Sequence, residues 1–142
     1  MTKERIDEII DGLIEFVGSK NIKDILSCLG IHLLVVEPDN ILLNGNRAVY
    51  NRIGPFECIY IANDLYNRDF VIAHELGHAV LHVEEATTFF NPLLNKGKLE
   101  NEANYFAVRL LHRDLEIEDG IETKSQLAIR LGIKEDYIKY II

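Results

Sequence analysis

The chain has little cysteine and proline, no tryptophan and no long apolar run. Its 142 residues include two cysteines and three prolines. A transmembrane helix needs about 20 consecutive apolar residues, and no such run exists, so we expect no membrane span. Met1 leads into the charged stretch TKERIDEIIDGL, which is unlike a secretory signal. Two lone cysteines in apolar surroundings, Cys28 and Cys58, then indicate reduced core residues of a cytoplasmic protein.

Positive charge is scarce as well. The chain has 15 Lys and Arg against 23 Asp and Glu, which gives a formal net charge of -8. Such a balance repels phosphate backbones and argues against direct binding of nucleic acid. The C-terminal stretch 124–141 has a faint helix-turn-helix rhythm, but the charges in and beside it are balanced, so we expect packed helices there rather than DNA recognition.

The spacing of apolar residues predicts an α+β fold in one domain, 1–142. The predicted elements are helices at 3–17 and 21–30, strands at 31–37, 47–53 and 56–62, and helices at 70–82, 98–113 and, as two short pieces around Gly132, 123–142. Gly30 ends the second helix, and irregular chain is expected around Asn91-Pro92 and Gly97. Helices, a small sheet and further helices are typical of the α+β class.

The predicted helix FVIAHELGHAVLH, 70–82, carries two histidines and a glutamate among apolar residues. Burying such groups without partners costs several kcal/mol. His74 and His78 lie four residues apart, so a helix places them on one face, one turn apart. This is the H-E-x-x-H spacing, in which two imidazoles bind zinc and the glutamate, here Glu75, reaches the attacking water. Two core histidines are the alternative, but the strand-then-helix context and Gly77 favour the metal.

His82 follows four residues after His78 but does not fit the same ion. Helical geometry carries it roughly 80° around the helix and about 12 Å along it from His74. We therefore expect a helix-end residue that bonds a carbonyl or a carboxylate.

A catalytic zinc needs a third protein ligand. The acidic candidates are Glu84, Glu85, Glu100 and Glu102. The first two follow the helix end too closely to fold back easily. On the helix 98–113, Glu100 lies roughly 60° from the centre of the apolar face and Glu102 roughly 100° away on the other flank. We choose Glu100, with Glu102 as the alternative, and expect Glu102 to face the surface or the substrate.

Asn104 stands one turn after Glu100 on the same side of this helix. It could brace a ligand imidazole or the carboxylate as an outer partner of the metal site. Four side chains are candidates for an oxyanion donor: Tyr60, Tyr105, Arg109 and His112. The strand ECIYIA, 57–62, either borders the cleft and receives the substrate as an added strand or is an ordinary buried strand.

The blocks HELGHAVLH and ENEANYFAVRLL resemble the two signature blocks of the ImmA/IrrE family of metallopeptidases, which occur in phages, mobile elements and their bacterial hosts. The resemblance is specific over 70–111 and implies a zincin-like fold, in which a small mixed sheet packs against the HExxH helix. It implies that His74, His78 and Glu100 hold the metal and that Glu75 is the catalytic glutamate. The chain departs from the family at LLHRD, where His112 replaces an apolar residue and no proline ends the helix.

The resemblance also implies a function. It indicates a metalloendopeptidase that uses zinc, or alternatively manganese, and that cleaves a helix-turn-helix repressor to relieve repression of a phage or mobile element. The alternative is a metal-binding antirepressor that binds the repressor without cutting it.

Overall fold

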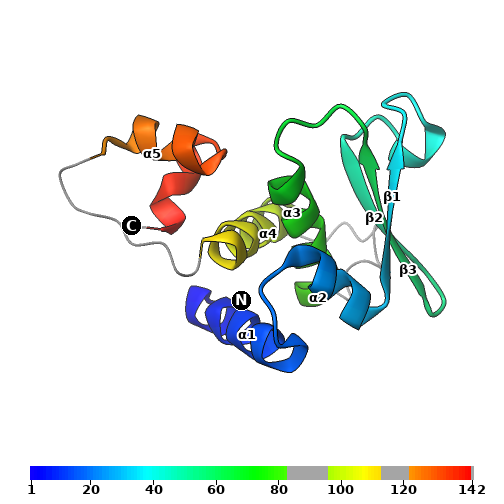
Figure 1. The fold of residues 1–142 in the computed structure, drawn as a ribbon, viewed down its shortest axis with the longest axis horizontal. Helices are drawn as coiled ribbons and strands as arrows, with labels where there is room; N and C mark the ends of the chain where they lie inside the picture. The colour runs from blue at the N-terminus through cyan, green and yellow to red at the C-terminus, as the bar shows by residue number, and fades with distance from the viewer. Residues whose placement is uncertain (83–95, 113–121, 142) are drawn as a thin grey trace.

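The computed structural model describes residues 1–82, 96–112 and 122–141 (Figure 1). The elements are α1 Lys3–Val17, α2 Ile22–Leu29, β1 Ile31–Val36, η1 Ile41–Leu43, β2 Ala48–Ile53, β3 Phe56–Ala62, α3 Arg68–Leu81, α4 Lys96–Leu111, α5 Lys124–Leu131 and η3 Glu135–Tyr140. The predicted α+β class is confirmed. The last element is a 3-10 helix, and Gly97, expected in irregular chain, lies in α4. Asn91-Pro92 and Arg113 lie outside the described residues.

The first two helices begin and end where short-range signals place them. Thr2 accepts a hydrogen bond from the backbone of Arg5 and caps α1, and Asn21 caps α2 in the same way. Gly30 ends α2 with a φ of 72°, a left-handed conformation that favours glycine. The predicted end of this helix is therefore confirmed.

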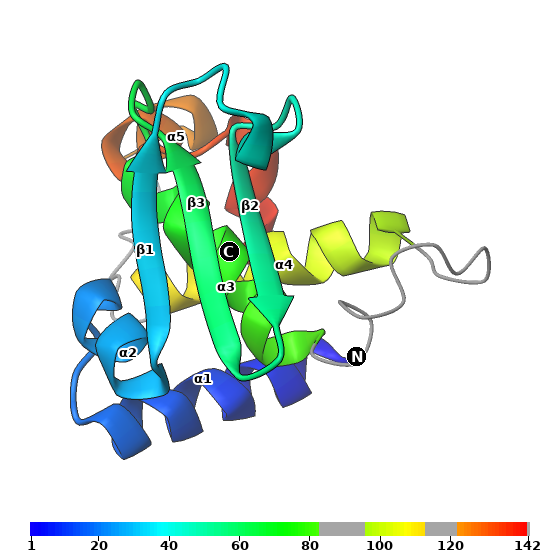
Figure 2. The same cartoon turned by 90° about the vertical axis from the view of Figure 1, so that its right-hand side faces the viewer.

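The three strands form one mixed sheet in the order β1-β3-β2. β1 runs parallel to β3, and β2 runs antiparallel to it. Ile59 and Ile61 on β3 are fully buried in the core, and the helices lie on one side of the sheet (Figure 2). Because β3 is paired on both edges, it cannot accept an added strand. The prediction that ECIYIA receives the substrate in this way is wrong, and the alternative of an ordinary buried strand holds.

The two long helices α3 and α4 pack closely at Gly77. A Cβ built at Gly77 would lie 3.1 Å from Phe106 Cδ1 and 3.3 Å from the Cα of Ala103. Phe106 is fully buried and Ala103 Cα is backbone, so neither can move aside cheaply. The absence of a side chain at this position therefore sets the distance between α3 and α4.

We expect Gly77→Ala to lower the free energy of unfolding by about 1 kcal/mol. Overpacking a core costs about 1–3 kcal/mol, and the better helix propensity of alanine offsets about 1 kcal/mol of that. Chemical denaturation of the metal-free protein measures the change. Gly12→Ala on α1 is the matched control, because a Cβ there meets no atom within 4 Å. It should stabilise the protein; equal effects of the two variants would contradict the close packing at Gly77.

The cysteine prediction is half right. Cys58 is buried and Cys28 is exposed, and both are free. The core-facing residues of α2 are Ile22, Ile25 and Leu26, and helical geometry places Cys28 roughly 110° from the centre of that face. Its apolar neighbours in sequence therefore do not bring it into the core.

The C-terminal elements form a small cluster of their own. Leu127 and Ala128 of α5 pack with Ile138 of η3. Tyr137 stacks on Phe70 of α3 with ring centroids 5.4 Å apart, and Tyr140 meets Tyr105 of α4 edge-on at 5.7 Å. Packed C-terminal helical elements are thus observed as expected. Across the described ranges, no helix combines the length and hydrophobicity that a membrane crossing requires.

Candidate metal centre

His74 and His78 project from the same face of α3, as their spacing predicts. Their ring centroids are 4.8 Å apart and the rings are nearly perpendicular. The two Nε2 atoms face each other at 3.2 Å. Both side chains are mostly buried, with 15% and 19% exposed. The helix alone therefore brings two potential nitrogen ligands to one point.

Glu100 reaches the same point from α4. Its Oε2 lies 3.1 Å from His74 Nε2, and its Oε1 lies 2.9 Å from His78 Nε2. The three potential ligand atoms all lie within 4.8 Å of one another. Over half of the Glu100 side chain, 57%, is exposed. The cluster therefore opens toward solvent on the carboxylate side.

The cluster fits a divalent cation. In a tetrahedral zinc site with bonds of about 2.0–2.1 Å, ligand atoms lie roughly 3.3 Å apart. The two Nε2 atoms lie 3.2 Å apart, and each lies 2.9 to 3.1 Å from its nearer carboxylate oxygen of Glu100, which is close to this value. Two imidazoles and one carboxylate also form a donor set that zinc accepts in catalytic sites, where a fourth position stays open.

Asn104 orients the first imidazole. Its Oδ1 lies 2.7 Å from His74 Nδ1, so the ring N–H donates to the amide oxygen. Because Nδ1 keeps its proton against Asn104, Nε2 is the nitrogen that faces Glu100 and His78. When protonated it donates to Glu100, and without that proton its lone pair would be available to a cation. The expected bracing by Asn104 thus acts on an imidazole rather than on the carboxylate.

His74 and Glu100 shift one another's pKa values toward the charged forms. Hydrogen bonds from His74 and His78 hold the pKa of Glu100 well below its usual range, although burial opposes this. Burial alone would lower the pKa of His74, but the hydrogen bond to Glu100 and the charges of Glu75 and Glu100 raise it above its ordinary value. A cation at this point would therefore compete with protons for His74.

Glu75 lies beside the histidines in a different electrostatic setting. Burial raises the pKa of its carboxyl group, and the positive charges of His74 and His78 oppose that shift. A backbone hydrogen bond from Tyr50 on β2 also favours the charged form. The sequence does not indicate this role of Tyr50, because a contact through the backbone of a distant strand leaves no signal in residue type. A carboxylate with a raised pKa beside the cluster is suited to accept a proton.

Glu102 does not occupy the expected position. Only 9% of the residue is exposed, so the predicted surface or substrate-facing role is wrong. Its Oε2 lies 2.9 Å from His82 Nε2, so His82 bonds a carboxylate at the helix end, as expected. The side of α4 that faces away from its predicted apolar face is also covered. Val108 on that side is fully buried, and α4 contacts α1 and η3 as well as α3. Glu84 and Glu85 lie outside the described residues.

Three of the four oxyanion candidates are placed away from the cluster. The Tyr105 hydroxyl and Arg109 Nε both donate to Asp7 on α1, each at 3.1 Å. Tyr60 lies on the face of β3 opposite the buried Ile59, because side chains alternate along a strand. These predictions are not supported by the described contacts.

The fourth candidate, His112, follows the end of α4. Its Nε2 is buried and has no hydrogen-bond partner among the described residues. Burial and, secondarily, the charge of Arg130 lower the pKa of this imidazole. It is therefore held in the neutral form, and no described contact connects it to the cluster.

Residues 27–134 match a family model of peptidases described as the IrrE N-terminal-like domain. The chain is 30% identical over 144 residues to the metallopeptidase ImmA of Bacillus subtilis (strain 168), with 93% of this chain and 80% of that protein covered. Over 62 residues it is 51% identical to the uncharacterized immunity region protein 2 of Bacillus phage phi105, with 42% of this chain and 39% of the phage protein covered.

Proposed function

Because the chain belongs to the IrrE N-terminal-like peptidase family, we propose that it is a zinc-dependent endopeptidase that cleaves a helix-turn-helix repressor of a phage or mobile element. The convergence of His74, His78 and Glu100 on one point carries this proposal. The similarity to a metallopeptidase and to a phage immunity-region protein supports a protease that acts in repressor regulation.

In this proposal His74 and His78 bind the ion through Nε2, and Glu100 binds it through a carboxylate oxygen. Zinc is preferred for two nitrogen ligands and one oxygen ligand, with manganese as the alternative. When bound, such an ion polarises a peptide carbonyl and lowers the pKa of water toward about 7. Asn104 fixes the His74 ring that presents Nε2 to it.

Glu75 is the general base and then the general acid of the proposed reaction. It accepts a proton from the attacking water and then delivers that proton to the leaving nitrogen of the peptide bond. Burial raises the pKa of Glu75, which brings its basicity closer to the operating pH. The backbone of Tyr50 supports the ionised form and ties the carboxylate to β2.

β2 is the strand where an extended substrate peptide would bind. In the sheet of the described residues β2 is an edge strand, and its Tyr50 contacts Glu75. A peptide that adds to this edge through main-chain hydrogen bonds would lie beside the carboxylate. The sequence suggested β3 as the strand that receives the substrate, and we now propose β2 instead.

The test is incubation of the zinc-loaded protein with the repressor encoded beside it, with and without a chelator. We expect two repressor fragments, their loss with chelator and their return when zinc is added back. Gel electrophoresis and mass spectrometry of the products measure this. Intact repressor with an altered affinity for DNA would instead support a metal-binding antirepressor that does not cut.

A further inference from the structure

The second histidine of the cluster is held differently from the first. His78 uses Nε2 to face Glu100, so its Nδ1 points to the other side of the ring. There it lies 3.0 Å from Nδ1 of His82, the residue that caps the C-terminal end of α3, four positions after His78. His74 has the amide oxygen of Asn104 in the corresponding place. A second imidazole is therefore the partner of His78.

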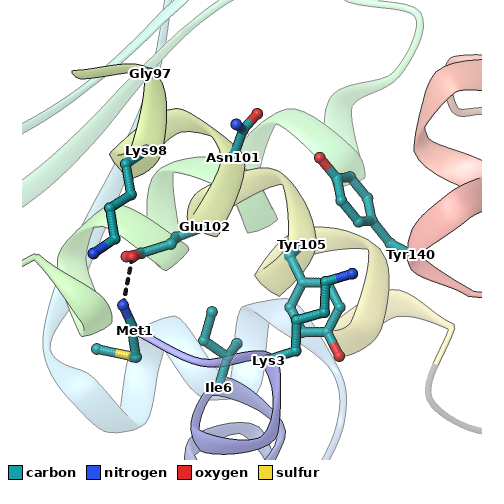
Figure 3. A pocket seen from close by; sticks show the side chains of 9 residues that line it. All are labelled: Met1, Lys3, Ile6, Gly97, Lys98, Asn101, Glu102, Tyr105 and Tyr140. Atoms are coloured by element: carbon teal, nitrogen blue, oxygen red, sulfur yellow. Dashed lines mark hydrogen bonds and ion pairs between the residues drawn. The ribbon is translucent and has the colours of Figure 1, made fainter. Parts of the chain in front are cut away.

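His82 connects His78 to a buried carboxylate. Its Nε2 lies 2.9 Å from Oε2 of Glu102 on α4. His82 and Glu102 are only 3% and 9% exposed. Oε1 of Glu102 lies 3.0 Å from the amino group of Met1, at the edge of a pocket of about 520 Å³ (Figure 3). Both carboxylate oxygens are thus bonded, and His82 and Glu102 are largely shielded from water.

The row of hydrogen bonds can run in only one direction when His78 offers a lone pair from Nε2. Its ring proton must then be on Nδ1 and must donate to Nδ1 of His82. Neutral His82 must therefore carry its own proton on Nε2, where it donates to Glu102. The reverse arrangement would place a proton of His82 against the proton of His78.

We propose that His82 and Glu102 are positioning residues that fix the ring orientation and proton location of His78 and so strengthen its binding of the ion. This inference rests on the proposed metal centre. A carboxylate at the end of the row raises the basicity of the ligand through the intervening imidazole. Among the described residues, His74 has no such carboxylate behind its partner, since its Nδ1 bonds the neutral amide of Asn104. The two proposed ligands therefore differ in that only His78 is connected to a negative charge through its Nδ1.

Zinc affinity of the Glu102→Gln variant tests the proposal. The substitution keeps the shape of the side chain and removes its charge. We expect the affinity for zinc, measured by competition with a chromogenic chelator, to fall by about 10–100-fold. The matched control is Asp7→Asn, which removes the carboxylate that Tyr105 and Arg109 of α4 contact without touching the row. Its zinc affinity should equal that of the wild type.

A second measurement does not depend on how a variant folds. Nitrogen-15 NMR of the histidine rings in the zinc-loaded wild-type protein reports which nitrogen carries the proton. We expect Nδ1–H for His78 and Nε2–H for His82. A proton on Nδ1 of His82, or unchanged zinc affinity in Glu102→Gln, would overturn this inference alone. Wild-type protein that binds no zinc would contradict the proposed function itself.

Discussion

Replacing Glu75 with glutamine is expected to lower repressor cleavage by about 10²–10⁴-fold while zinc binding is retained. The side chain is not among the three that converge on the metal point, so the ligands remain in place. The amide of glutamine cannot accept a proton from water, and a positioned general base contributes an effect of this size. Single-turnover cleavage of the repressor measures the loss, and the metal content of the purified variant measures what is kept.

A control variant separates the role of Glu75 from a general effect of losing negative charge. Glu15→Gln changes an exposed position on α1 and should cleave at the wild-type rate. If Glu75→Gln also cut the repressor at that rate, the proton transfer assigned to Glu75 would be wrong. If it lost its zinc as well, the carboxylate would instead have a part in holding the ion.

Glu100→Gln should weaken zinc binding more than Glu102→Gln does, that is, by more than about 100-fold. It removes the only negative charge among the three proposed ligands, whereas Glu102 acts through His82. Chelator competition on both variants gives the ranking. Thermal unfolding without metal is the control. It should show a folded Glu100→Gln variant with a modestly lower melting temperature, because Glu100 also bonds His74 and His78 although 57% of its side chain is exposed. The opposite ranking would make Glu102 the third ligand.

The choice between these two glutamates shows where helical periodicity is insufficient. The angles along α4 favoured Glu100 because it lay nearer the apolar face. In the structure Glu100 is the exposed residue of the pair and Glu102 the buried one. Glu100 reaches the histidines from the side of the cluster that is open to solvent. A site that receives a substrate must be open on one side. The position of Glu100 beside the histidines agrees with the prediction, but nearness to the apolar face does not explain it.

Short-range interactions account for the parts of the molecule that could be predicted. Hydrogen bonds within a helix place residues four apart on one face. His74 and His78 therefore lie together once 70–82 forms a helix, with Glu75 next to His74. Caps and glycines with positive φ act over a few residues, and for this reason the bounds of α1 and α2 were predictable.

Contacts between elements far apart in the chain account for the rest. Which strand lies in the centre of the sheet, which flank of α4 is covered and which carboxylate His82 meets all depend on how those elements dock. Docking follows from the summed packing of many side chains, such as the close approach of α3 and α4 at Gly77, and no short segment contains that information. Two proposed ligands and the contact of His82 with His78 thus follow from one helix, whereas the third proposed ligand and the carboxylate that bonds His82 are in place only because α4 packs against that helix.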